Sequence, residues 1–133
     1  MRILSIFLLL LILLGCSVSE RQDWKFMESV GGLTIVGQDK NPNWLIIRGD
    51  VSGVKEFSHK PTQLKSAIAV KEVEAIVQGA TIQLYVVTTL VSDKYPNTEI
   101  SGVNISGAKK GTCLVQYVNP DGTTVDLKQI TIY

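Results

Sequence analysis

The side chains with catalytic potential are few and widely separated. His59 is the only histidine, and Cys113 is one of two cysteines. A Cys–His nucleophile pair would have to join these two residues from an expected loop and an expected strand. No Gly-x-Ser-x-Gly elbow is present, so a Ser-His-Asp hydrolase is not indicated either. These features predict that the chain is not an enzyme, with His59 solvated and Cys113 buried and inert.

Acidic residues are spread along the chain, and Glu72 and Glu74 are the closest pair in its middle. On a strand this spacing places both carboxylates on one face, where they could serve a glycosidase or a calcium site. A solvated strand edge is a commoner role for such a pair. The segment Asp39-Lys40-Asn41 lacks the other ligands of a calcium loop. One histidine and two cysteines do not complete a structural zinc set. We therefore expect neither metal nor cofactor.

Two features could support binding instead of catalysis. Arg48-Gly49-Asp50 spells a tripeptide used by some adhesion ligands, although three-residue matches arise readily by chance. We expect most of the larger aromatic side chains to pack in the core or on strand faces, and Tyr95, beside Pro96, to be the best candidate for an exposed contact. The full set comprises Trp24, Trp44, Tyr85, Tyr95, Tyr117 and Tyr133.

The first sixteen residues form the most distinctive stretch of the chain. Arg2 precedes an apolar run over residues 3–14 that only Ser5 interrupts, and Gly15 and Cys16 follow. As a helix, this run would span roughly 18 Å at ~1.5 Å per residue, well short of the ~30 Å hydrocarbon core of a bilayer. A basic start, a short apolar run and a small residue are typical of a secretory signal peptide.

The end of this stretch, Leu13-Leu14-Gly15-Cys16, resembles the lipobox of bacterial lipoproteins. The resemblance implies that the Cys16 thiol receives a diacylglycerol and that a signal peptidase cuts between Gly15 and Cys16. It also implies an outer-membrane location facing the periplasm in a Gram-negative host, because Ser17 stands where an Asp favours retention at the inner membrane. The alternative is an ordinary signal peptide in which Cys16 is incidental.

Charge and cysteine content restrict the partners of the remaining chain. The sequence has 13 basic and 12 acidic residues, and loss of Arg2 with the signal peptide makes residues 16–133 formally neutral. No like-charged block exceeds Lys109-Lys110, which argues against nucleic acid and against electrostatic adhesion to anionic lipid. With Cys16 assigned to lipid, Cys113 has no partner for an intrachain disulfide. We therefore expect covalent attachment to the membrane through the acyl chains on Cys16.

The mature chain reads as a series of short strands. Polar residues 17–22 are expected to be a tether, followed by a first strand over residues 24–27. The strongest strand pattern covers residues 81–91, with Ile82, Leu84, Val86, Thr88 and Leu90 on the core face. The turn formers at residues 119–122 predict a final hairpin between residues 113–118 and 123–132. Further strands are expected at residues 33–36, 44–48 and 99–106, and a short strand or loop at residues 54–57.

Residues 63–78 are ambiguous, because their composition favours a helix but their apolar residues form no clean stripe at either period. A strand is favoured, since residues 78–80 resemble a hairpin turn. The alternative is one short helix around residues 63–77. Spaced strands of this kind predict a mainly β fold, a small antiparallel sandwich or barrel.

The expected organisation has three parts: a signal peptide over residues 1–15, a lipidated Cys and tether over residues 16–23, and one β-rich domain over residues 24–133. No known family is recognised in that domain. The expected function is that of an envelope lipoprotein that binds a protein partner without catalysis, as an accessory subunit of an envelope assembly. The alternative is an inhibitor or immunity lipoprotein against a lysozyme or toxin. An envelope hydrolase is disfavoured.

Overall fold

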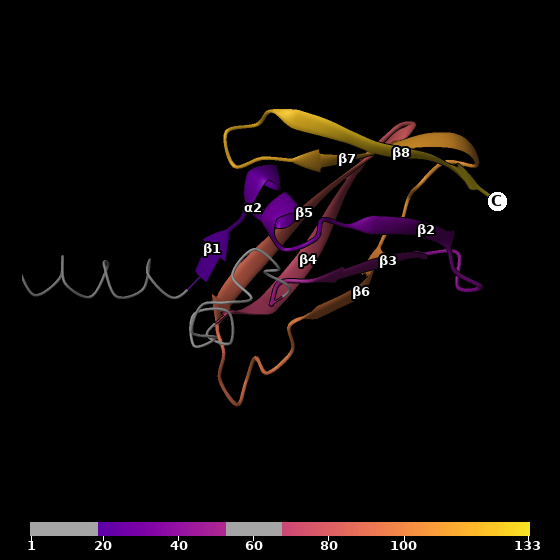
Figure 1. Cartoon of the computed structure of the whole chain (residues 1–133). Coiled ribbons are helices and arrows are strands. Elements are labelled where there is room, and N and C mark those ends of the chain that lie inside the picture. The colour runs from indigo at the N-terminus through magenta and orange to yellow at the C-terminus, as the bar shows by residue number, and fades with distance from the viewer. Residues whose placement is uncertain (1–18, 53–67) are drawn as a thin grey trace, which may run out of the picture.

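The computed structural model describes residues 19–52 and 68–133, and the predicted mainly β architecture is confirmed (Figure 1). Two sheets pack against each other as a sandwich, and a short helix lies beside them. The elements are β1 (Ser19–Arg21), α2 (Trp24–Ser29), β2 (Thr34–Gln38), β3 (Trp44–Asp50), β4 (Ile68–Gln78), β5 (Thr81–Leu90), β6 (Glu99–Asn104), β7 (Gly111–Val118) and β8 (Thr124–Ile132).

Strand β5 is the centre of the larger sheet. One of its edges pairs with β4 over almost its whole length. The other edge is shared by two strands: β7 runs parallel to Thr81–Leu84, and β1 runs antiparallel to Val87–Thr89. Strand β8 then pairs with β7 in the hairpin predicted from the turn formers. Strands β1 and β7 therefore lie end to end along one edge of β5.

The hydroxyl of Tyr117 occupies the junction between these two strands. It donates a hydrogen bond to the Gln22 carbonyl at 2.6 Å and accepts one from the Val86 N–H at 3.2 Å. Gln22 N–H donates to the Val86 carbonyl at 2.9 Å, and the Gln22 side chain reaches the Thr88 hydroxyl at 2.8 Å. Because the Tyr117 side chain is fully buried, its hydroxyl replaces solvent as the partner of two backbone groups.

The smaller sheet has the order β2-β3-β6 and is antiparallel throughout. Its β2 edge lies beside β8 and its β6 edge beside β4. Within residues 19–52 and 68–133 no strand ladder joins the two sheets, so this part of the chain is a sandwich and not a closed barrel. The facing surfaces bury a continuous apolar core. Its fully buried members include Met27, Leu45, Ile47, Ile82, Leu84, Val86, Ile105, Val115 and Tyr117.

The predicted strand over residues 24–27 is wrong, because these residues form helix α2. Asp23 caps the helix by accepting the Phe26 N–H at 2.8 Å. The helix ends where Gly32, with a φ of 74°, donates its N–H to the Met27 carbonyl. The apolar pattern instead buries Met27 in the core and places Trp24 against the Tyr117 ring, with centroids 5.3 Å apart.

The described part of the ambiguous segment is a strand, β4, and a β-bulge explains its unclear pattern. The register with β5 shifts between Val70 and Glu72, so Lys71 is the additional residue. The side chains that pack on the core therefore change parity along the strand: Ile68 and Val70 before the bulge, and Val73, Ala75 and Val77 after it. Residues 54–57 and 63–67 lie outside the described residues.

Part of the expected tether belongs to the domain. Ser19–Arg21 form strand β1, paired with Thr89, Thr88 and Val87 of β5, and Gln22 is buried. Polar side chains are compatible with this position because the backbone ladder, rather than side-chain burial, holds the strand in place. The ordered domain therefore begins no later than Ser19, earlier than residue 24.

Candidate functional site

The acidic residues singled out from the sequence do not converge on a metal site. Glu72 and Glu74 are both exposed on β4. Asp39-Lys40-Asn41 forms the turn between β2 and β3, in which the Asn41 side chain accepts the Asn43 N–H at 3.0 Å. Within residues 19–52 and 68–133, no cluster of three or more His, Cys, Asp or Glu side chains could hold a metal ion.

Cys113 is buried, in agreement with the prediction, with only 1% of its surface exposed. Its Sγ lies 3.5 Å from the Lys109 carbonyl oxygen, to which the thiol donates. His59, the only other member of the hypothetical nucleophile pair, lies outside the described residues. Burial of Cys113 leaves its thiol without direct access to a substrate from solvent.

The Arg48-Gly49-Asp50 tripeptide lies along the end of β3, and the partly exposed Asp50 carboxylate is hydrogen-bonded to the neighbouring Ser52. Its Oδ1 accepts the Ser52 N–H at 2.9 Å and the Ser52 hydroxyl at 2.6 Å. Burial raises the pKa of Asp50, but hydrogen bonds from Ser52 and Thr98 outweigh it, and the pKa lies below its ordinary value. This carboxylate stabilises the end of a strand and is not presented on a loop.

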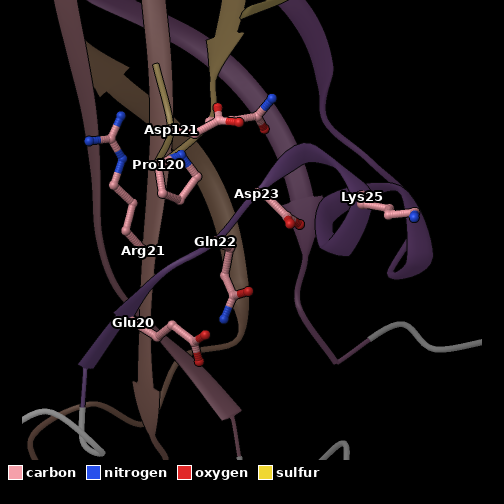
Figure 2. Close-up of a pocket in the computed structure, with 8 residues that line it drawn as sticks. Glu20, Arg21, Gln22, Asp23, Lys25, Pro120 and Asp121 are labelled. Carbon is pink, nitrogen blue, oxygen red and sulfur yellow. The ribbon is translucent and has the colours of Figure 1, made fainter. Parts of the chain in front are cut away.

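A polar depression lies where β1 and the start of α2 meet the turn between β7 and β8 (Figure 2). It is open to solvent, with a volume of about 460 Å³. Both signs of charge line it, since it contains three carboxylates and two cationic side chains. The lining residues are Glu20, Arg21, Gln22, Asp23, Lys25, Asn119, Pro120 and Asp121.

Most polar groups of this depression are already used by the fold. Asp23 caps α2, and Asp121 accepts from the backbone and hydroxyl of Thr123, mainly the hydroxyl, which lowers the pKa of Asp121. The Asn119 side chain accepts the Trp24 N–H at 2.7 Å and donates to Thr123 at 2.9 Å. The Trp24–Asn119 bond fastens the start of α2 to the β7–β8 turn, and the other bonds stabilise each of the two segments internally. The depression therefore has a structural role.

Arg21 also links β1 to the neighbouring strands. Its guanidinium lies 4.1 Å above the centroid of the Tyr85 ring, and one of its terminal nitrogens donates to the Val118 carbonyl at 3.4 Å. Figure 2 shows its side chain extending toward the turn that contains Pro120. The Nε atom is buried and has no hydrogen-bond partner among the described residues. Arg21 therefore connects three strands, β1, β5 and β7.

A second depression, here called the Trp44 groove, lies between the β4 and β6 edges and has a volume of about 340 Å³. On one side it is bounded by Val73 and Glu74 of β4, and on the other by β6. Carboxylates of Glu74 and Glu99 lie at its rim. The groove is lined by Trp44, Val73, Glu74, Glu99, Ile100, Ser101, Gly102, Val103 and Asn104.

The Trp44 ring lies directly on Gly102 of the neighbouring strand. A Cβ atom added at Gly102 would overlap the indole ring at Nε1, Cε2 and Cζ2, so only glycine allows the ring to lie this close to β6. The side chain remains partly exposed at the groove. Trp44 is thus a partly exposed aromatic side chain packed on Gly102, beside edges of β4 and β6 that have no ladder partner among the described residues.

The other aromatic residues have mainly structural roles. Trp24 and Tyr117 pack against each other, and Tyr85 lies beneath Arg21. Tyr95 is only partly exposed, with Lys94 Nζ 5.5 Å from its ring centroid, whereas Tyr133 is 82% exposed at the chain end. The sequence pattern favoured Tyr95 as the exposed contact and did not predict the Trp44 groove. The groove depends on the contact of Trp44 with Gly102, which is far away in the sequence.

The residues that carry the lipoprotein resemblance, Gly15 and Cys16, lie outside the described residues. Among the helices in residues 19–52 and 68–133, none has the length and hydropathy needed to cross a membrane.

The chain matches no protein-family model, and searches among curated proteins and solved structures return no match.

Proposed function

We propose that this chain is a lipid-anchored envelope protein that binds a protein partner in the Trp44 groove and catalyses no reaction. The lipobox resemblance supports acylation of Cys16 after cleavage between Gly15 and Cys16, with an outer-membrane location facing the periplasm in a Gram-negative host. Two or three acyl chains, at about 0.8 kcal/mol per buried CH₂, suffice for stable anchoring.

One observation carries the assignment of the groove: the Trp44 ring packs on Gly102 beside the edge of β6 that faces β4. Tryptophan is enriched among the residues that dominate protein interfaces, since it buries a large area with few rotatable bonds. Fixing the ring before binding lowers the entropy that association must overcome. Strand edges without a ladder partner offer backbone N–H and C=O groups to an incoming extended segment.

The rim of the groove favours a cationic partner segment. Glu74 of β4 and Glu99 of β6 are exposed on opposite sides, while the partly exposed side chains of Val73 and Trp44 supply apolar surface. An extended segment with one apolar side chain against Trp44 and a Lys or Arg near the two carboxylates would complement this surface. Such a segment would lie along the groove, with its backbone toward the β6 edge.

The test is a pull-down from detergent-solubilised envelopes with the lipidated protein as bait, followed by mass spectrometry. Trp44→Ala and Glu74→Lys are expected to lose the partner. Glu72→Lys is the matched control, because Glu72 is exposed on the same strand but does not line the groove. Equal recovery of the partner by all three variants would refute the assignment of the groove.

The identity of the captured protein separates the two binding functions. Components of a multi-protein envelope machine would make this chain an accessory subunit. A single stoichiometric lysozyme or toxin would make it an inhibitor or immunity lipoprotein.

The anchor has a separate test. Cys16→Ala is expected to abolish incorporation of labelled lipid and to leave the precursor uncut. Normal acylation of that variant would refute the lipoprotein assignment.

A further inference from the structure

We propose that the end of the domain formed by the start of β1, the end of β5 and the following loop rests directly on the lipid headgroups. Leu90 and Val91 are its main contacts. This inference rests on the proposed acylation of Cys16 and goes beyond it, because an acyl anchor by itself leaves the orientation of the domain free. The occupant of this surface is the membrane that holds the chain.

The chain between the proposed anchor and the first strand is short. Ser19 already belongs to β1, paired with Thr89. Only three peptide steps separate its Cα from that of Cys16, and at 3.8 Å per step they reach at most about 11 Å. The headgroup layer of one leaflet is itself roughly 5–8 Å thick. Another protein domain does not fit between this end and the bilayer.

The same end of the domain exposes two apolar side chains. Paired Cα atoms of antiparallel strands lie about 4.5–5.5 Å apart, so Leu90, next to Thr89, lies within about 9 Å of the Ser19 Cα. Leu90 is 55% exposed and Val91 43% exposed, two of the five large apolar side chains that are exposed in the described residues. Apolar side chains beside a lipid-bearing residue gain burial when they enter the headgroup boundary.

The loop that follows fits the same surface. Its turn is closed by hydrogen bonds between Ser92 and Tyr95, and Lys94 lies over the Tyr95 ring. Lysine and tyrosine combine an apolar body with a polar tip, which suits the level of the headgroups. Lys71 also lies at this end, where its Nζ donates to the Ser19 hydroxyl at 3.0 Å.

This orientation places the Trp44 end of the groove away from the membrane, whereas the Glu99 end lies nearer to it. Strand β6 begins at Glu99, directly after the loop at the membrane end, and runs to Asn104, which pairs with Trp44. Five steps at ~3.3 Å carry the chain roughly 17 Å. Figure 1 shows the C-terminus at the far end of the molecule from the start of β1. A partner could therefore reach the groove from the solvent side.

The experiment uses the acylated full chain in phosphatidylcholine vesicles, with a nitroxide label at Val91→Cys or at Asn43→Cys. Asn43 is exposed in the β2–β3 turn next to Trp44 and serves as the distal control. The Cys16 thiol carries lipid and Cys113 is buried, so the introduced cysteine takes the label. The measured quantity is the ratio of the label's collision rate with oxygen, which concentrates in lipid, to that with a water-soluble nickel chelate.

The ratio is expected to be several-fold higher at position 91 than at position 43, and to fall when Leu90→Asp is added to the Val91→Cys protein. Equal ratios at the two positions, in protein shown by mass spectrometry to be acylated, would overturn the membrane contact and leave the anchor intact. Absence of acyl groups from Cys16 would overturn both.

Discussion

Replacing Tyr117 by Phe tests how the first strand is held in the domain. The substitution keeps the ring that packs on Trp24 and removes only the hydroxyl. Two backbone groups then lose their partner: the Gln22 carbonyl, bonded at 2.6 Å, and the Val86 N–H, bonded at 3.2 Å. Both lie in a region from which water is excluded, since Tyr117 is fully buried and Gln22 is 8% exposed.

The expected loss follows from these two bonds. An unsatisfied buried backbone group costs about 1–3 kcal/mol, and the short bond to Gln22 counts toward the upper end of this range, the longer bond to Val86 toward the lower. Tyr117→Phe should therefore lower the free energy of unfolding by about 3 kcal/mol. That is a large share of the roughly 5–15 kcal/mol by which a domain is stable.

Urea unfolding of a soluble form that begins at residue 17 measures this loss. Tyr133→Phe is the matched control, because it removes the same hydroxyl from a side chain that is 82% exposed, and surface changes usually stay within about 0.5 kcal/mol. Hydrogen exchange of the Gln22 N–H, which donates to Val86, should accelerate in Tyr117→Phe. Equal stability of the two variants, with unchanged exchange at Gln22, would refute the reasoning.

Three further predictions concern the cap, the groove and alkaline pH. Asp23→Ala removes the cap of α2 and should cost about 0.5–2 kcal/mol in urea unfolding, whereas Asp93→Ala, in an exposed loop, should cost little. Gly102→Ala should displace the Trp44 ring, which a shift of tryptophan emission and loss of the pulled-down partner would report; an unchanged spectrum would contradict the contact. Burial raises the pKa of Tyr117 to about 12 from 10.0, so the folded state binds this proton more tightly than the unfolded state. The contribution of Tyr117 to the free energy of unfolding should therefore be fully present below pH 10. It should fall by roughly 2–3 kcal/mol as the pH rises to 12 and above, and this fall should be absent in Tyr117→Phe.

Those parts of the fold that depend on local pattern were predictable from the sequence. Strand β5 alternates β-branched and apolar residues over its whole length, and its predicted core face is buried from Ile82 to Thr88. Leu90 departs from that prediction because it extends past the core. The final hairpin was also predictable from the sequence. Gly122, with a φ of 91°, closes its turn by donating its N–H to the Asn119 carbonyl.

Other features depend on information that a local pattern does not contain. Four residues, 24–27, fit a strand or a helical turn equally well, and the Asp23 cap decides for the helix. Because Lys71 is an additional residue in β4, the core-facing positions before and after it differ in parity. No single period along the sequence therefore identifies the core face of this strand. The Trp44 groove was missed because it requires Gly102 to lie beside Trp44, a relation set only by the pairing of β3 with β6.

The position of β1 connects the proposed anchor to the proposed binding groove. Because Ser19–Arg21 pair with β5, and β5 pairs with β4, a force applied at Cys16 would pass through two strand ladders to the wall of the groove. A tether over residues 16–23 would instead leave the domain free to move relative to the anchor. If β1 detaches, as Tyr117→Phe should promote, the domain loses its fixed distance from the membrane before it loses its core. The Val91 label should then report weaker lipid contact while the partner still binds the groove, which separates orientation from recognition.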